Sequence, residues 1–129
     1  MATDLFLPDD RPALACSIQG VPLRMMVDTG STATILRKEV FNSLKHLLPV
    51  VRTGYLSGIS GARTEAPVVS MDGLRIGNLT VSDLEAYVLD VEIIGSGGEG
   101  SVSGVFGMSL LRHMPPLRVD FTAKTVTFG

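Results

Sequence analysis

The feature of this sequence that most restricts its fold is an apolar stretch that runs directly into an acidic residue. Residues 22–27 (PLRMMV) are followed at once by Asp28, Thr29 and Gly30. Burial of an ionised carboxylate costs several kcal/mol unless hydrogen bonds compensate for it. The hydroxyls of Thr29 and Ser31 supply such bonds, and Gly30 lets backbone N–H groups come close to the carboxylate. We therefore expect a strand that ends by directing Asp28 inward, where it can stay ionised in a closed pocket.

Alternating apolar and polar residues elsewhere predict a mainly β protein. Residues 13–19 alternate with a period of two, which is typical of a half-buried strand, and Gly20 lies at the turn before residues 22–27. A short β-prone stretch spans residues 32–35. The same signals predict further strands at 50–55, 66–70, 73–76, 79–81, 85–91, 117–121 and 125–128.

One or two short helices complete the predicted fold. Apolar residues between positions 40 and 48 recur three to four residues apart, and this pattern stops before Pro49. Residues 108–114 (MSLLRHM) precede two prolines and indicate a second short helix. Residues 95–104 (GSGGEGSVSG) are so rich in glycine and serine that we expect a flexible loop there.

Length and charge limit the classes of protein to which the chain can belong. Its 129 residues, 45% of them hydrophobic, are enough for one domain with a core. We assign residues 1–129 to a single domain and expect residues 1–11 to form a loosely ordered N-terminal arm. The net charge of −2 leaves no basic surface for nucleic acid.

Cysteine and histidine usage argues against a metal site or a thiol nucleophile. Cys16 is the one cysteine, so neither an intramolecular disulfide nor a cysteine-based zinc site is possible. Its place on the apolar face of an alternating strand favours a core cysteine. The two histidines, His46 and His113, add no metal signature. We expect no metal and no organic cofactor.

The chain carries no signal peptide pattern and no apolar run long enough to span a membrane. A cytoplasmic location is the default expectation. If the chain is a domain of a longer protein, a periplasmic or membrane-tethered location is the alternative.

Three segments carry a resemblance to a known family. They are Val27–Thr32 (VDTGST), residues 58–61 (GISG) and Val105–Arg112 (VFGMSLLR). The chain resembles the retropepsin-like, or retroviral-type, single-domain aspartic proteases. The motif style is closest to cellular and bacterial members, which often read Gly-Met-Asp-Phe-Leu-Arg in the third segment. The first and third segments together are specific, and the resemblance extends from Ala13 to the terminal strands.

This resemblance implies a closed β-barrel of the acid-protease fold, assembled as a homodimer. Peptide hydrolysis by this route uses two carboxylates that share one proton, because two like charges in contact cannot both ionise. One carboxylate activates a water and the other donates to the carbonyl oxygen. A chain with one Asp-Thr-Gly motif takes its second aspartate from another copy, which implies that Asp28 and its symmetry mate meet at a two-fold axis.

The resemblance also implies roles for the residues around Asp28. Thr29 would brace the two active-site loops, Gly30 would donate its amide to the carboxylate, and Ser31 would hydrogen-bond the outer carboxylate oxygen. A hydroxyl in that place favours the ionised form, so we expect a more acidic pH optimum than with alanine at 31.

The same resemblance implies that the second segment is a flap and that the third supports the active site. The flap would close over an extended peptide and exclude water, and the apolar-apolar-glycine segment would support the site. The flap residues are Gly58, Ile59, Ser60 and Gly61, and the supporting residues are Val105, Phe106 and Gly107.

Two departures from the family pattern leave alternatives open. Ser103 stands where members commonly have aspartate, and Phe106 is bulkier than the usual residue. The leading interpretation is an aspartic endopeptidase. The main alternative is a catalytically weak or inactive dimeric domain of the same fold that binds extended peptides or mediates assembly. A third is an unrelated β-barrel binding module in which Asp28 is a turn residue.

Overall fold

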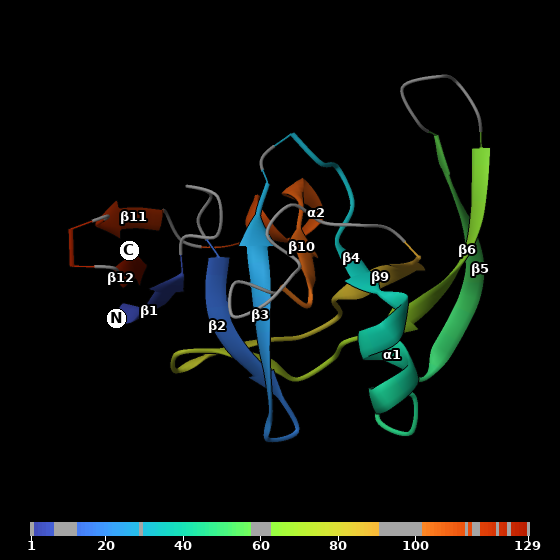
Figure 1. Cartoon of the computed structure of the whole chain (residues 1–129), viewed down its shortest axis with the longest axis horizontal. Coiled ribbons are helices and arrows are strands. Elements are labelled where there is room, and N and C mark those ends of the chain that lie inside the picture. The colour runs from blue at the N-terminus through green and yellow to red at the C-terminus, as the bar shows by residue number, and fades with distance from the viewer. Residues whose placement is uncertain are drawn as a thin grey trace.

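Strands are the main secondary structure among the described residues of the computed structural model, in agreement with the predicted mainly β class (Figure 1). The structure describes residues 2–6, 13–28, 30–57, 63–90, 102–112, 114, 117–120, 122–123 and 125–128. The strands are β1 (Ala2–Phe6), β2 (Ala13–Ile18), β3 (Val21–Val27), β4 (Ile35–Arg37), β5 (Val50–Ser57), β6 (Arg63–Ser70), β7 (Leu74–Ile76), β8 (Leu79–Val81), β9 (Glu85–Leu89), β10 (Gly104–Phe106), β11 (Leu117–Asp120) and β12 (Thr125–Phe128). The helices are α1 (Lys38–Leu44) and α2 (Met108–Leu111). Neither helix in these ranges is long and apolar enough to cross a membrane.

The sheet is open, so the predicted closed β-barrel is wrong for this chain. Among the described residues the strands follow the order β11-β12-β1-β2-β3-β10-β4-β9-β6-β5, with β7 and β8 attached beside β2. The terminal strands β11 and β5 do not pair with each other, and they lie on opposite sides of the molecule (Figure 1). Closure fails because the long β5–β6 hairpin extends away from the other strands instead of curling back toward β11.

Parallel pairing brings the centre of the sheet together from distant parts of the sequence. Strand β10 pairs in parallel with β3 and antiparallel with β4, and β4 pairs in parallel with β9. Parallel neighbours require long crossover connections, so residues far apart in sequence become adjacent here. The end of β3, where the acidic motif begins, therefore lies beside the end of β10.

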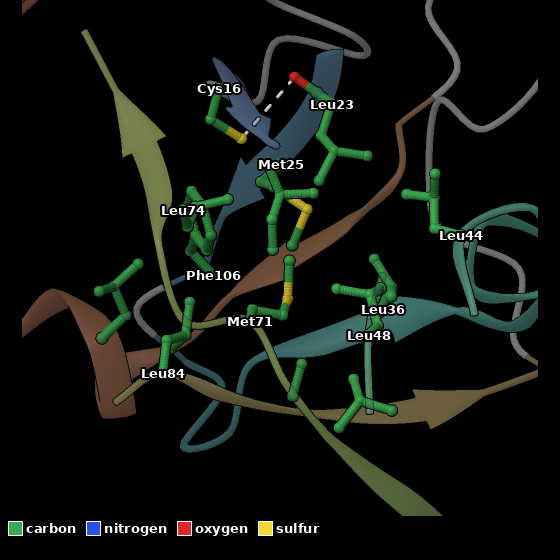
Figure 2. Packing of buried hydrophobic residues seen from close by; sticks show 14 of the residues in the cluster. Cys16, Leu23, Met25, Leu36, Leu44, Leu48, Met71, Leu74, Leu84 and Phe106 are labelled. Carbon is green, nitrogen blue, oxygen red and sulfur yellow. Dashed lines mark hydrogen bonds between the residues drawn. The ribbon is translucent and has the colours of Figure 1, made fainter. Parts of the chain in front are cut away.

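A cluster of aliphatic and methionine side chains fills one face of this sheet. Met25, Leu36, Met71 and Phe106 are fully buried within it (Figure 2). Cys16 is buried there as predicted, and its thiol donates to the Leu23 carbonyl oxygen across 3.7 Å. Burial raises the pKa of this thiol to about 12, because a thiolate would be poorly solvated in the core. The core cysteine was correctly inferred from strand alternation.

The chain ends and the short elements differ from the sequence-based expectations in a few places. Residues 2–6 of the expected N-terminal arm form strand β1, which pairs with β12 and with β2. The first helix spans Lys38–Leu44 and is followed by a turn that buries Leu48. The expected flexible loop ends earlier than predicted, because Gly104 is already the first residue of β10. Residues 95–101 of that loop lie outside the described residues.

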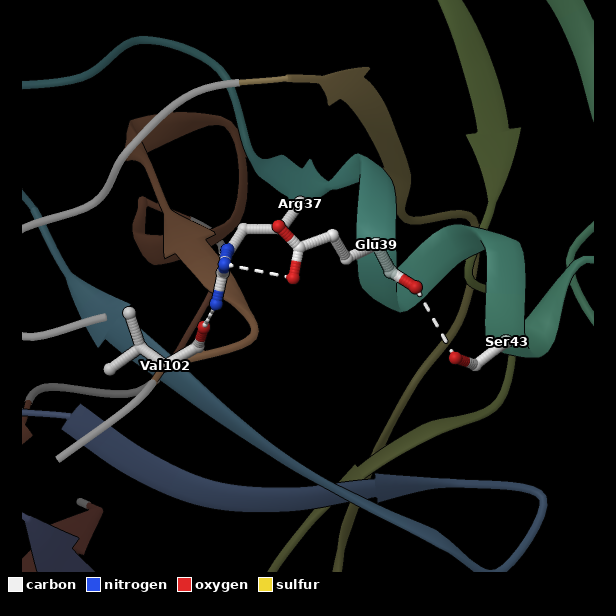
Figure 3. Close-up of polar contacts among 4 residues, drawn as sticks. All are labelled: Arg37, Glu39, Ser43 and Val102. Carbon is white, nitrogen blue, oxygen red and sulfur yellow. Dashed lines mark hydrogen bonds and ion pairs between the residues drawn. The ribbon is translucent and has the colours of Figure 1, made fainter. Parts of the chain in front are cut away.

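Polar contacts of Arg37 attach β4 and α1 to the segment that leads into β10 (Figure 3). The guanidinium Nη1 donates to the Val102 carbonyl oxygen at 3.1 Å, and Nη2 lies 3.2 Å from a Glu39 carboxylate oxygen. Next to Val102, the Ser103 hydroxyl accepts a hydrogen bond from the Arg24 backbone N–H at 3.0 Å. Ser103, a departure from the family pattern, thus extends the contact between β10 and β3.

Gly104 is the point of closest approach between the central strands. It lies opposite Met25 on β3 and Leu36 on β4. A Cβ atom at this position would collide with the Ile35 carbonyl oxygen and come within 2.9 Å of the Met25 terminal methyl. The collision with a backbone atom cannot be relieved by a side-chain rotation, so β10 requires glycine here.

We expect Gly104→Ala to lower the free energy of unfolding by about 3 kcal/mol or more, because β3 and β4 must separate to admit the methyl group. Gly73→Ala is the matched control. It has open space around its Cβ but a positive φ of 87°, which costs a non-glycine residue about 1 kcal/mol. Urea unfolding of both variants measures the difference. Equal losses in the two variants would contradict the packing argument.

Candidate active site

Asp28 follows directly after β3 and is held by the neighbouring strand. Its backbone N–H donates to the Phe106 carbonyl oxygen at 3.0 Å, which continues the parallel β3–β10 pairing by one residue. The residue is half-buried, and its side chain lines a cavity of about 410 Å³. The predicted strand that ends with an inward-directed aspartate is therefore present.

Backbone amide groups approach Asp28 as the sequence predicted. The Gly30 N–H donates to the Asp28 carboxylate oxygen Oδ1 at 2.9 Å, and the Ser31 N–H donates to the Asp28 carbonyl oxygen at 3.2 Å. A Cβ atom on Gly30 would lie 3.2 Å from Oδ1, which is a tight contact. Gly30 thus allows the amide and the carboxylate to meet without obstruction by a side chain.

The Ser31 hydroxyl makes a different hydrogen bond from the one implied by the family resemblance. It donates to the Ala33 carbonyl oxygen at 2.8 Å. A hydroxyl has a single hydrogen to donate, so the predicted donation to the Asp28 carboxylate is absent in this arrangement. The acceptor lies only two residues ahead in the chain, so the bond is internal to the loop that follows Asp28.

The three predicted supporting residues lie against the loop that carries Asp28. Val105, Phe106 and Gly107 are all buried. A Cβ atom on Gly107 would collide with the Ala33 carbonyl oxygen and lie 2.8 Å from the Ser31 carbonyl oxygen. Gly107 therefore permits backbone-to-backbone contact between the two segments.

Helix α2 fastens the same loop through its first two amide groups. The Met108 N–H donates to the Ser31 carbonyl oxygen at 2.8 Å, and the Ser109 N–H donates to the Thr32 carbonyl oxygen at 2.9 Å. These donors have no partners within the helix, because they belong to its first turn. The loop after Asp28 thus satisfies the start of α2, and α2 in turn fixes the loop.

Thr34 completes this junction and was not singled out from the sequence. It is the one buried polar side chain of the described residues, at 1% exposure. Its hydroxyl lies 3.2 Å from the Ser109 hydroxyl and accepts from the Gly107 N–H at 3.4 Å. The sequence gives no sign of this role for Thr34, because its hydrogen-bond partners come from a segment far along the chain.

Side chains from four strands form the largely apolar walls of the cavity beside Asp28. Ile35 comes from β4, Leu56 from β5, Thr64 from β6 and Leu89 from β9, and together with residues of the Asp28 loop they enclose it. None of these four was predicted as a site residue. They are brought together by sheet order, which the sequence pattern does not specify.

Some of the predicted site residues lie outside the described residues. These are Thr29 and the flap residues Gly58, Ile59, Ser60 and Gly61. The arms of the predicted flap, β5 and β6, are described and pair antiparallel up to Ser57 and Arg63. Within the described ranges, no group of three or more His, Cys, Asp and Glu side chains is placed to hold a metal ion.

Solved structures with the same fold are retropepsin-like. A retropepsin-like aspartic protease from Rickettsia conorii matches with a TM-score of 0.62 and 20% identity, over 98% of this chain and 86% of that one. The retroviral protease-like domain of Ddi1 from Leishmania major matches with a TM-score of 0.61 and 18% identity, over 98% of this chain and 88% of that one. The EIAV protease, solved with the inhibitor HBY-793, matches with a TM-score of 0.60 and 18% identity, over 84% of this chain and 91% of that one. The fold is thus that of the retropepsin-like aspartic proteases.

Sequence comparison identifies the family independently. The family model described as Aspartyl protease matches residues 14–110, which include Asp28 and the Val105–Gly107 segment. Because the match covers most of the chain, this protein belongs to the aspartyl protease family. No significant match was found among curated protein sequences.

We expect Thr34→Val to lower the free energy of unfolding by about 1–3 kcal/mol, because the buried Gly107 N–H loses its acceptor. Ser109→Ala is the control, since it removes only the contact between the two hydroxyls and should cost about 0.5–1 kcal/mol. Chemical denaturation of both variants gives the comparison. Equal costs would mean that the Gly107 amide does not depend on Thr34.

Proposed function

We propose that this protein is an aspartic endopeptidase in which two Asp28 carboxylates, one from each protomer of a homodimer, activate a water for attack on a peptide bond. The observation that carries the proposal is the position of Asp28. It lies half-buried at the edge of a cavity of about 410 Å³, with a backbone amide on its carboxylate. Membership of the aspartyl protease family supports the same chemistry.

The requirement for two copies follows from the chemistry together with the composition of the site. One carboxylate must accept a proton from water while a second, protonated one donates to the carbonyl oxygen of the substrate. Among the described residues, Asp28 is the one acidic residue that lines this cavity. We infer that a second Asp28 completes the pair across a two-fold axis, which makes the contact between protomers self-complementary.

The proposed substrate is a peptide in an extended conformation. Strands β5 and β6 border the Asp28 cavity through Leu56 and Thr64, and the predicted flap residues 58–61 lie between these strands in the sequence. We propose that Gly58, Ile59, Ser60 and Gly61 close over the bound peptide, excluding water and adding main-chain hydrogen bonds. Thr29 is proposed to brace the two Asp28 loops against each other.

We expect Asp28→Asn to reduce kcat for cleavage of a peptide library by at least about a hundredfold while the protein stays folded, because an amide cannot exchange protons with water as a carboxylate does. Asp90→Asn, at an exposed carboxylate beyond β9, is the control and should retain activity. Full activity in Asp28→Asn would refute an aspartic mechanism.

Mixing the two forms tests the shared site. If wild-type and Asp28→Asn subunits are co-expressed in equal amounts and assort at random, only dimers with two wild-type subunits are active, so we expect about one quarter of the wild-type activity. Independent sites would instead retain about half. Stable dimers that bind peptides without cutting them would favour the alternative of a peptide-binding domain.

We expect Ser31→Ala to leave the pH profile of cleavage unchanged and to lower the free energy of unfolding by about 1 kcal/mol, because the lost hydroxyl bonds Ala33 and not Asp28. Rates from pH 3 to 8, measured together with chemical denaturation, separate the two effects. An optimum shifted to higher pH in Ser31→Ala would show that the hydroxyl acts on the carboxylate in the active dimer.

A further inference from the structure

A second hollow of about 610 Å³ adjoins the Asp28 cavity. The two share Thr32, Ala33 and Leu56 as lining residues, so they are separated by no more than these side chains. An extended peptide advances about 3.3 Å per residue and directs alternate side chains to the same side. A peptide that lies across Asp28 can therefore place a side chain in this hollow.

The far wall of the hollow is aromatic and charged, in contrast to the apolar wall beside Asp28. Tyr87 and Tyr55 line it, but the alternation of side chains along β5 places the Tyr55 ring on the opposite face from Arg52 and Leu56, where the Arg63 Cζ lies 4.5 Å from the ring centre. Arg52 lies beside Tyr87 and Glu85. Its Cζ is 5.9 Å from the centre of the Tyr87 ring, and its Nη2 is 2.6 Å from a Glu85 carboxylate oxygen. The pKa of this guanidinium is raised, most by a hydrogen bond with Tyr87 and next by one with Glu85. The wall thus already holds one cation between a ring and a carboxylate.

Gly54 permits this arrangement of the wall. A Cβ atom there would lie 2.6 Å from the Tyr87 ring and 2.8 Å from a Val68 methyl group. Since real Cβ atoms do not approach so closely, a larger residue would displace Tyr87 from β5. The absence of a side chain at Gly54 keeps the ring in place beneath Arg52.

Among the described residues that line the hollow, acidic side chains outnumber basic ones. Glu85 is engaged by Arg52, whereas the carboxylate of Asp83 has no ion pair or hydrogen bond as an acceptor among the described residues. The Asp83 backbone, with φ of 58°, is held by its N–H donating to Asp72 Oδ1 at 3.0 Å. Two carboxylates against one guanidinium leave an excess of one negative charge.

We propose that this hollow is a specificity subsite that selects a basic side chain, lysine or arginine, of the peptide substrate. The inference rests on the proposed endopeptidase function and adds a charge preference to it. Asp83 and Glu85 attract the cationic end of the substrate side chain, and the Tyr87 ring contacts its apolar stem.

The experiment uses peptides with a fixed scissile pair, in which each flanking position in turn carries lysine, norleucine or glutamate. Norleucine matches the lysine stem without the charge. At one position we expect wild-type kcat/KM to favour lysine over norleucine by about two- to fivefold, the range for an exposed ion pair. High salt should reduce this ratio, because the charges are near the surface.

Three variants assign the preference to the hollow. Asp83→Asn and Glu85→Gln each make it neutral and should bring the lysine-to-norleucine ratio close to one. Asparagine is well suited to the positive φ at position 83, so this variant keeps the loop conformation. The double variant leaves Arg52 alone and should favour glutamate. Glu65→Gln removes an exposed carboxylate of the same β5–β6 hairpin outside the hollow and should keep the wild-type ratio.

Binding separates failure of this inference from failure of the proposed function. The same peptides, labelled with a fluorophore, are titrated with Asp28→Asn, which does not require catalysis. Tighter binding of a lysine peptide than of its norleucine match supports the subsite even if nothing is cut. Cleavage without a lysine preference at any position overturns the subsite and leaves the endopeptidase. Equal binding of the two peptides, or no binding of either, also overturns the subsite.

Discussion

Backbone contact between Gly107 and the loop after β3 is the constraint on which the rest of the site depends. Because no side chain stands at Gly107, the carbonyl groups of Ser31 and Ala33 can lie directly against it. The same contact lets the first amides of α2 reach that loop and lets Thr34 accept from the Gly107 N–H. The Asp28 carboxylate is therefore held by main-chain geometry, which is more rigid than a frame of long side chains.

The parts of the fold that the sequence predicts well are those determined by neighbours along the chain. The β2–β3 hairpin follows from alternation around Gly20, and Asp28 was correctly assigned to the end of its second strand. The buried run ending at Gly107 was recognised from its own composition together with the family motif. In each case the pattern and its structural consequence lie close together along the chain.

What the sequence did not predict depends on partners that are distant in the chain. Strand β1 exists because it pairs with β12 at the other end of the chain, and closure into a barrel was wrong because β5 and β11 do not meet. Leu89 reaches the cavity through the parallel pairing of β9 with β4. The Ser31 hydroxyl donates to the Ala33 carbonyl oxygen, a partner set by the loop conformation and not by the sequence motif.

The burial of Cys16 has a consequence for the whole protein. Because burial raises the pKa of its thiol, the thiolate is scarcely populated at neutral pH. Because thiolates carry the reactivity of cysteine, this side chain resists oxidants and alkylating reagents as long as β2 remains packed. The lone cysteine is thus a natural chemical label: it reacts when the core opens, so its modification rate reports how often the sheet comes apart in an otherwise native population.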